Sequence, residues 1–294
     1  MKKYFLNIAC CVLLIACGNK STPPPPVFPD PKGPDGGEYF ENEVKPTLSK
    51  PCFQGAYYRK VVSSVDNWVG IKGEFTLPII QFDEDRKNPN KPGQYLDNPS
   101  VYMGGNMDGQ ETDIGLTWEV IRHANGDIST ERLAFRPFLR RTGHKSGQQS
   151  LYQNAPAEAG YYWYPGEKVF MSLEIVGDGL LKFVIQGAGK SYETTFECAG
   201  YTLNRKGEFK RVNAIDQVSN EGKPAQATKA SVSNSKWLYT TLIRMEKGGK
   251  VDAPMHTGRY SPMACPLVKH FSLIQSDEEK KVGAETINIS GAGY

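Results

Sequence analysis

Residues 112–120 read Thr-Asp-Ile-Gly-Leu-Thr-Trp-Glu-Val, and every second side chain in this stretch is apolar. The apolar set consists of Ile114, Leu116, Trp118 and Val120, and the set of opposite parity contains Asp113, Thr117 and Glu119. Successive side chains of a β-strand point to opposite faces of the sheet. The alternation therefore predicts a strand that buries one face, with Trp118 in the core, and presents the other face to a ligand or to solvent.

The same period of two recurs along the chain, in residues 69–77, 169–175 and 181–185. Turn signals lie between such runs, at residues 124–127 and 177–179. The 30 glycines, 20 prolines and 15 tyrosines favour a turn-rich β protein, and no run predicts a long helix, because residues 277–281 are charged and the run is short. We predict an all-β fold, an antiparallel β-sandwich or jelly roll, with a long loop over residues 142–159 and irregular structure over residues 246–266.

Charge argues against nucleic-acid binding, and hydropathy argues against a membrane-spanning helix. The formal net charge is +3, so the chain has no electrostatic reason to bind nucleic acid. No stretch reaches the 18 or so apolar residues of a membrane-spanning helix.

The N-terminus predicts export. Lys2 and Lys3 precede an apolar run that ends in small residues, as in a secretory signal. Its ending, Leu-Ile-Ala-Cys at residues 14–17, resembles the lipobox of bacterial lipoproteins, which implies signal peptide 1–16 and lipidation at Cys17. Gly18 after the cysteine, by the same resemblance, implies the outer membrane of the cell envelope; the alternative is an ordinary signal peptide. Residues 17–37 hold seven prolines and predict an extended tether, which leaves 38–294 as one domain.

Three cysteines remain in the predicted domain: Cys52, Cys198 and Cys265. An odd number in an oxidising compartment indicates one disulfide and one buried thiol, with the pairing left open. No Cys-x-x-Cys spacing occurs, and the four histidines (123, 144, 256 and 270) are scattered. We therefore predict no metal and no cofactor.

The polar face of the strand at 112–120 is the predicted binding surface. Asp113, Thr117 and Glu119 would line it together with Arg136 from the next strand, whose arginines share one parity. The alternative is a solvated sheet of cross-strand ion pairs. Tyr161 and Trp163 belong to the densest aromatic cluster and could stack on sugar rings, although packing at a sandwich edge competes equally.

The strand pattern resembles the concanavalin A-like lectin/glucanase superfamily. Within it, Glu111-Thr112-Asp113-Ile114 is similar to the start of the Glu-x-Asp-x-x-Glu motif of laminarinase-type glycoside hydrolases. That resemblance implies a nucleophile at Glu111 and a supporting carboxylate at Asp113. The proton donor of the motif is missing, because its position holds Leu116.

A longer segment resembles the glutamic peptidases, or eqolisins. Motifs of that family have similar segments here, in the same order along the chain. Its Trp-Val-Gly-Ile-Asp-Gly and Gln-Thr-Gly-x-Asp-Trp resemble residues 101–118, its Glu-Trp-Tyr-Pro resembles residues 162–165, and its Arg-Thr-Asn-Ala resembles residues 210–214. The positions of its catalytic Gln and Glu hold Asp113 and Ser219. The resemblance implies the fold and not that chemistry.

These observations lead to one hypothesis and two alternatives. We expect an envelope-anchored lipoprotein that binds glycans, without catalysis, on the concave sheet around Asp113. The first alternative is a diverged hydrolase that uses Glu111 or Asp113, which predicts paired carboxylates in one cleft. The second is an envelope module whose sandwich serves only as a protein-binding surface.

Overall fold

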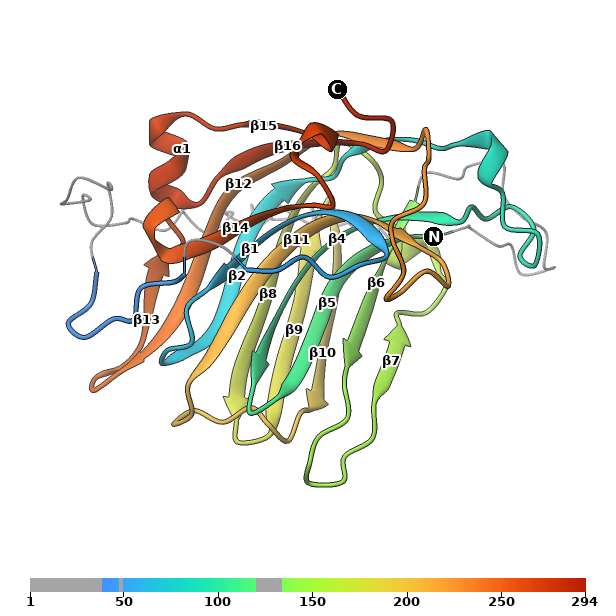
Figure 1. The fold of residues 1–294 in the computed structure, drawn as a ribbon. Helices are drawn as coiled ribbons and strands as arrows, with labels where there is room; N and C mark the ends of the chain where they lie inside the picture. The colour runs from blue at the N-terminus through green and yellow to red at the C-terminus, as the bar shows by residue number, and fades with distance from the viewer. Residues whose placement is uncertain (1–38, 48–49, 120–133) are drawn as a thin grey trace, which may run out of the picture. The chain divides into compact units, whose positions relative to one another are not determined.

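The computed structural model describes residues 39–47, 50–119 and 134–294, without the side chain of Glu119. The predicted signal peptide, Cys17, the tether and the turn at 124–127 lie outside these residues. In the described part, two antiparallel sheets stack face to face (Figure 1). The predicted all-β sandwich is therefore confirmed.

The first sheet has seven strands. In spatial order they are β14 (Tyr260–Cys265), β1 (Ala56–Ser63), β11 (Gly207–Gln217), β4 (Asp97–Met107), β5 (Gln110–Glu119), β6 (Ala134–Arg141) and β7 (Leu151–Asn154). Residues 112–119 belong to β5, which lies between β4 and β6. All partners in this sheet run antiparallel.

The second sheet has nine strands. Its main path is β10 (Lys190–Glu197), β9 (Leu180–Gly187), β8 (Lys168–Gly177), β2 (Trp68–Thr76), β12 (Ser231–Glu246), β16 (Glu285–Ser290) and β15 (Phe271–Ile274). The strands β13 (Gly249–Pro254) and β3 (Ile79–Gln81) pair with β12.

The core fills the space between the two sheets and follows the predicted parity. Ile114, Leu116 and Trp118 of β5 are buried in the same cluster as Ile71 and Phe75 of β2. Trp118 is 5% exposed, so its predicted place in the core is confirmed. Burial of this large apolar set is the main favourable term that holds the sheets together.

Two sequence predictions were wrong in detail. The segment predicted as a loop, 142–159, contains the short strand β7, and the segment predicted as irregular, 246–266, contains β13 and β14. Both were missed because turns and edge strands show little hydrophobic alternation. The single α-helix among the described residues, α1 (Asp277–Val282), has six residues, and no described helix could cross a membrane.

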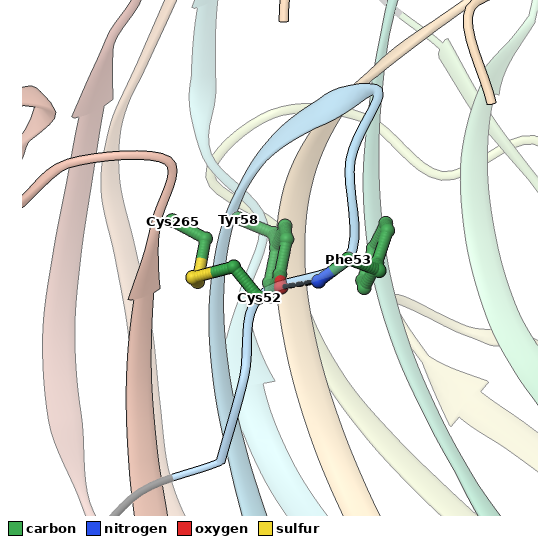
Figure 2. Close-up of a disulfide and its surroundings, with 4 residues drawn as sticks. All are labelled: Cys52, Phe53, Tyr58 and Cys265. Carbon is green, nitrogen blue, oxygen red and sulfur yellow. Dashed lines mark hydrogen bonds between the residues drawn. A yellow bond between two sulfur atoms is a disulfide. The ribbon is translucent and has the colours of Figure 1, made fainter. Parts of the chain in front are cut away.

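The cysteines behave as predicted. Cys52 and Cys265 form a disulfide with their Cα atoms 5.9 Å apart (Figure 2). Cys198 is a buried free thiol, and burial raises its pKa to about 12. The disulfide ties the chain before β1 to the end of β14, the strand that pairs with β1 at the sheet edge.

Candidate functional site

The face of the seven-stranded sheet that points away from the core, here called the outer face, is only partly solvated. It carries a second buried apolar cluster, made of Ala56, Tyr58, Val62, Tyr102, Phe138, Val212, Ala214, Met263 and Cys265. Polar side chains of the same parity lie among these residues, and Asp113, Thr117 and Lys210 are each at most 8% exposed. The outer face is thus a semi-buried surface with embedded polar groups, and such groups need partners.

Asp113 lies at the centre of a four-residue row across the sheet. The register places Lys210 of β11, Gly104 of β4, Asp113 of β5 and Arg140 of β6 side by side. Lys210 Nζ is 2.8 Å from Asp113 Oδ1, and Arg140 Nη1 donates to Asp113 Oδ2 over 2.9 Å. Gly104 makes this possible, because it has no side chain between the lysine and the carboxylate. A Cβ at that position would lie 3.1 Å from Lys210 Cε.

The electrostatics of this row keep Asp113 ionised. Burial by itself raises the pKa of Asp113, but the charges and hydrogen bonds of Lys210 and Arg140 outweigh it, and the pKa is lowered. Burial likewise disfavours the ammonium of Lys210, but the nearby carboxylates of Asp113 and Glu111 raise its pKa. Asp113 is therefore ionised at neutral pH and lies between two cations.

This arrangement favours the ion-pair alternative for Asp113. Lys210 also pairs with Glu111, so both acids of the predicted alternative catalytic set share one ammonium. Asp113 Oδ2 accepts a hydrogen bond from Arg140 and Oδ1 lies beside the ammonium of Lys210, so the charge of Asp113 is balanced without a ligand.

A cleft of about 530 Å³ opens beside this row on the outer face. It is bounded by strands β4, β5, β6, β7 and β11 and by the loop that follows β11. Its lining residues are Asn98, Ser100, Thr117, Phe138, Tyr152, Asp216, Gln217, Val218, Ser219, Glu221 and Lys223. Two aromatic rings, hydroxyls, amides and two carboxylates therefore converge on one space.

Asp216 is the titratable group of this cleft with the strongest shift. Burial raises its pKa to about 6; the hydrogen bond from Ser100 opposes this effect, and the negative charges of Asp113 and Glu221 add to it. Ser100 Oγ donates to Asp216 Oδ2 over 2.6 Å. No cation forms an ion pair with Asp216 among the residues that the structure describes. Asp216 thus changes protonation near neutral pH, whereas Asp113 does not.

The structure brings only some predicted site residues to the cleft. Thr117 lines it and donates from Oγ1 to Asn98 Oδ1 over 3.3 Å. Arg136 is partly buried on β6, directly opposite Thr117 in the register. Glu119 is placed only as a strand position, paired with Ala134.

The two predicted aromatic ligands lie elsewhere. Trp163 is fully buried in the core and donates from Nε1 to the Gly187 carbonyl over 3.2 Å, so its predicted stacking on a ligand is wrong. Tyr161 packs edge-on against Tyr192 of β10, in the nine-stranded sheet, with ring centroids 5.7 Å apart. The aromatic cluster at 161–164 serves packing, which was the competing interpretation.

Sequence reasoning missed the residues that define the cleft, chiefly Asp216, Glu221, Ser100 and Tyr152. A signal for Asp216 was present: Lys210, Val212, Ala214 and Asp216 share one parity, as the β11 register shows. Glu221 and Tyr152 carried no such signal, because one follows a strand and the other lies in a short edge strand.

Among the described residues, no group of three or more His, Cys, Asp or Glu is arranged to hold a metal ion.

No protein-family model matches the chain, and no curated protein is similar to it in sequence. Solved structures with a similar fold include scytalido-glutamic peptidase with a transition state analog inhibitor: TM-score 0.48, 8% identity, covering 80% of this chain and 98% of that chain. SCP-B, a member of the eqolisin family in complex with a tripeptide, has a TM-score of 0.41 and 8% sequence identity, and the match covers 79% of this chain and 97% of that chain. LamAcat from Zobellia galactanivorans has a TM-score of 0.31 and 12% sequence identity, and the match covers 59% of this chain and 64% of that chain. At such identities and scores, none of these proteins assigns a function to this chain.

Proposed function

We propose that this chain binds an oligosaccharide in the cleft on the outer face, centred on Tyr152 and Asp216. The observation that carries the proposal is the convergence of an exposed aromatic ring with buried hydrogen-bonding groups. Tyr152 is 59% exposed, and its ring lies 6.2 Å from that of Phe138 at an angle of 23°. An exposed ring that stacks beside a second ring offers a surface to the apolar face of a pyranose.

The polar lining complements the hydroxyls of a sugar. Asn98, Ser100 and Thr117 supply an amide and two hydroxyls from adjacent strands, and these side chains are held by their strand register. Asp216, from the neighbouring strand β11, and Glu221, from the loop after it, supply carboxyl oxygens. Apolar rings with a few fixed polar groups characterise small-molecule sites, because the rings provide affinity and the polar groups provide orientation.

Binding of the folded chain to a broad glycan panel, measured by calorimetry, tests this proposal. We expect Tyr152→Ala to weaken binding roughly fivefold to tenfold, the loss of one stacking ring. Tyr294→Ala is the matched control, because Tyr294 is 68% exposed and does not line the cleft. Failure of a folded chain to bind any glycan would reject the proposal and favour a protein partner.

One observation favours a second candidate, hydrolysis in the same cleft. Asp216, with its pKa of about 6, shares the cleft with Glu221. A protonated Asp216 could give its proton to the leaving oxygen while Glu221 takes a proton from the attacking water, whose oxygen bonds to the carbon released. Release of reducing ends that Asp216→Asn abolishes would establish this chemistry. Binding without any product would leave the chain a binding protein.

We also propose that the chain is a lipoprotein of the outer membrane, anchored through Cys17. The support is the sequence alone: a basic start, a short apolar run and the lipobox-like residues 14–17. A stable anchor needs two or more acyl chains, which lipidation of this kind provides. Incorporation of labelled palmitate into the wild-type chain and not into Cys17→Ser, together with membrane fractionation, tests this proposal.

A further inference from the structure

The Cys52–Cys265 disulfide lies at one end of a short segment, residues 51–55, here called the strap. The disulfide fixes this segment at the edge of the seven-stranded sheet, where Cys265 lies opposite Tyr58 in the register. Beyond the disulfide, Phe53 stacks on Tyr58 with ring centroids 4.1 Å apart and an angle of 9°. The Phe53 amide donates to the Tyr58 hydroxyl oxygen over 2.9 Å (Figure 2). The strap is thus held on the outer face by three contacts.

The far end of the strap contacts the loop that follows β11. The Gly222 amide donates to the Gln54 carbonyl over 3.3 Å. Gly55 has φ +110°, and a Cβ there would lie 2.4 Å from the Asn220 carbonyl oxygen and 3.0 Å from Glu221 Cα. The strap and the loop therefore touch backbone to backbone, and a glycine is needed for the approach.

This loop forms one wall of the cleft, through Val218, Ser219, Glu221 and Lys223. The Asn220 side chain also stabilises the loop from within: its Nδ2 donates to Gln217 Oε1 over 3.0 Å and to the Pro224 carbonyl over 3.0 Å. The strap adds the hydrogen bond to Gly222 and the close approach of Gly55. The chain of contacts thus runs from the disulfide, through Phe53 and Gln54, to the cleft wall.

We propose that the strap is a positioning element for the cleft, and that the Cys52–Cys265 disulfide makes the shape of the Glu221 wall sensitive to the redox state. With the bond intact, the strap holds the loop and fixes Glu221 and Lys223 in the wall. With the bond open, the strap leaves Tyr58, the loop loses its contacts at Gln54 and Gly55, and the wall loosens. The sandwich itself stays folded, because its core lies between the sheets and does not include the strap.

Opening the bond requires a dithiol reductant. Its thiolate attacks one sulfur, the S–S bond breaks, each cysteine becomes a thiol, and the reductant becomes a disulfide. Residue Cys52 is exposed, so such a reagent can approach from its side. The buried thiol of Cys198, with a pKa of about 12, does not compete as a nucleophile.

Amide hydrogen exchange of the intact chain tests the proposal without any ligand. We expect peptides that cover 218–223 to exchange roughly fivefold faster or more after reduction with dithiothreitol, while peptides from β5 and β8 are unchanged. Cys52→Ser should reproduce this result without a reductant. Gly55→Ala should do the same with the disulfide intact, because its Cβ would displace the loop. Gly248→Ala is the matched control, since a Cβ there meets nothing within 4 Å.

Unchanged exchange at 218–223, with the bond shown to be open by thiol labelling, would overturn the proposal. An equal increase across all strands would overturn it too, because the disulfide would then stabilise the whole domain. The consequence for ligand affinity rests on the proposed function and is measured separately, by calorimetry with the same glycan panel before and after reduction. A loosened wall in a chain that binds no glycan would refute the proposed function and leave the positioning role intact.

Discussion

Asp216→Asn gives the sharpest test of the electrostatics of the cleft. The substitution keeps the shape of the side chain and an oxygen that can accept the hydrogen bond from Ser100. It removes the ionisation, and so it removes the energetic cost of holding a carboxylate in this place. We expect the variant to be more stable than the wild type at neutral pH, which is typical of a group kept for function at the expense of stability.

The size of the effect follows from the pKa. Burial raises the pKa of Asp216 from 3.8 to about 6, and each pKa unit corresponds to about 1.4 kcal/mol. Between these two values the folded chain keeps a proton that the unfolded chain has lost, so stability falls as the pH rises through this window. The full difference is about 3 kcal/mol; because the side chain is partly exposed to the cleft, about 2 kcal/mol is the expected value.

Urea unfolding of both proteins between about pH 4 and pH 8 measures this difference directly. The stability of the variant relative to the wild type should rise across this range, with most of the rise between about pH 4 and pH 6. Glu158→Gln, a change at an exposed carboxylate outside the cleft, is the control and should show no such trend. A relative stability of Asp216→Asn that does not change with pH would refute the assigned environment.

Three further predictions concern the packing around the site. Lys210→Met should cost about 2–4 kcal/mol in urea unfolding at neutral pH and less in acid, where Asp113 no longer needs a cation; a loss independent of pH would mean that Lys210 acts by packing alone. Gly104→Ala should cost at least about 2 kcal/mol, because its Cβ would lie 1.9 Å from the Thr112 carbonyl oxygen, and wild-type stability would contradict the close approach of β4 and β5. Trp163→Ala should cost about 3–5 kcal/mol in the same assay without changing glycan affinity, and a selective loss of binding would contradict its place in the core.

The fold could be predicted from the sequence because burial imposes a period on each strand. In β5, Ile114, Leu116 and Trp118 face the core, as the alternation indicates. Short strands at the edges give no such signal: β7 has four residues, none of them buried, so nothing in its composition separates it from a loop. The hydrophobic alternation therefore predicts the central strands of the sheets and does not predict the short edge strands.

The site was harder to predict, because it depends on register and on a loop. Asp113 was correctly placed on the outer face, but its partner Lys210 is 97 positions further along the chain and reaches it only across Gly104. Local spacing cannot show such a row. Glu221 belongs to the cleft only because the loop after β11 folds back against the strap, and neither segment carries a periodic pattern.

Asp113 and Asp216, two acids of the outer face, differ in their surroundings, and this difference bears on the function of the cleft. Asp113 has two cations within hydrogen-bonding distance and a lowered pKa, whereas Asp216, in the part of the chain that the structure describes, accepts from the Ser100 hydroxyl and has a pKa of about 6. Paired acids whose environments separate their pKa values are the usual basis of acid and base roles, but here only Asp216 faces the cleft. A binding protein would lose little from Asp216→Asn, because an amide oxygen still accepts a hydrogen bond from a sugar hydroxyl. A hydrolase would keep its affinity and lose its turnover, because an amide cannot supply the proton. The same substitution that measures the cost of the buried carboxylate therefore also shows whether that cost serves catalysis or recognition.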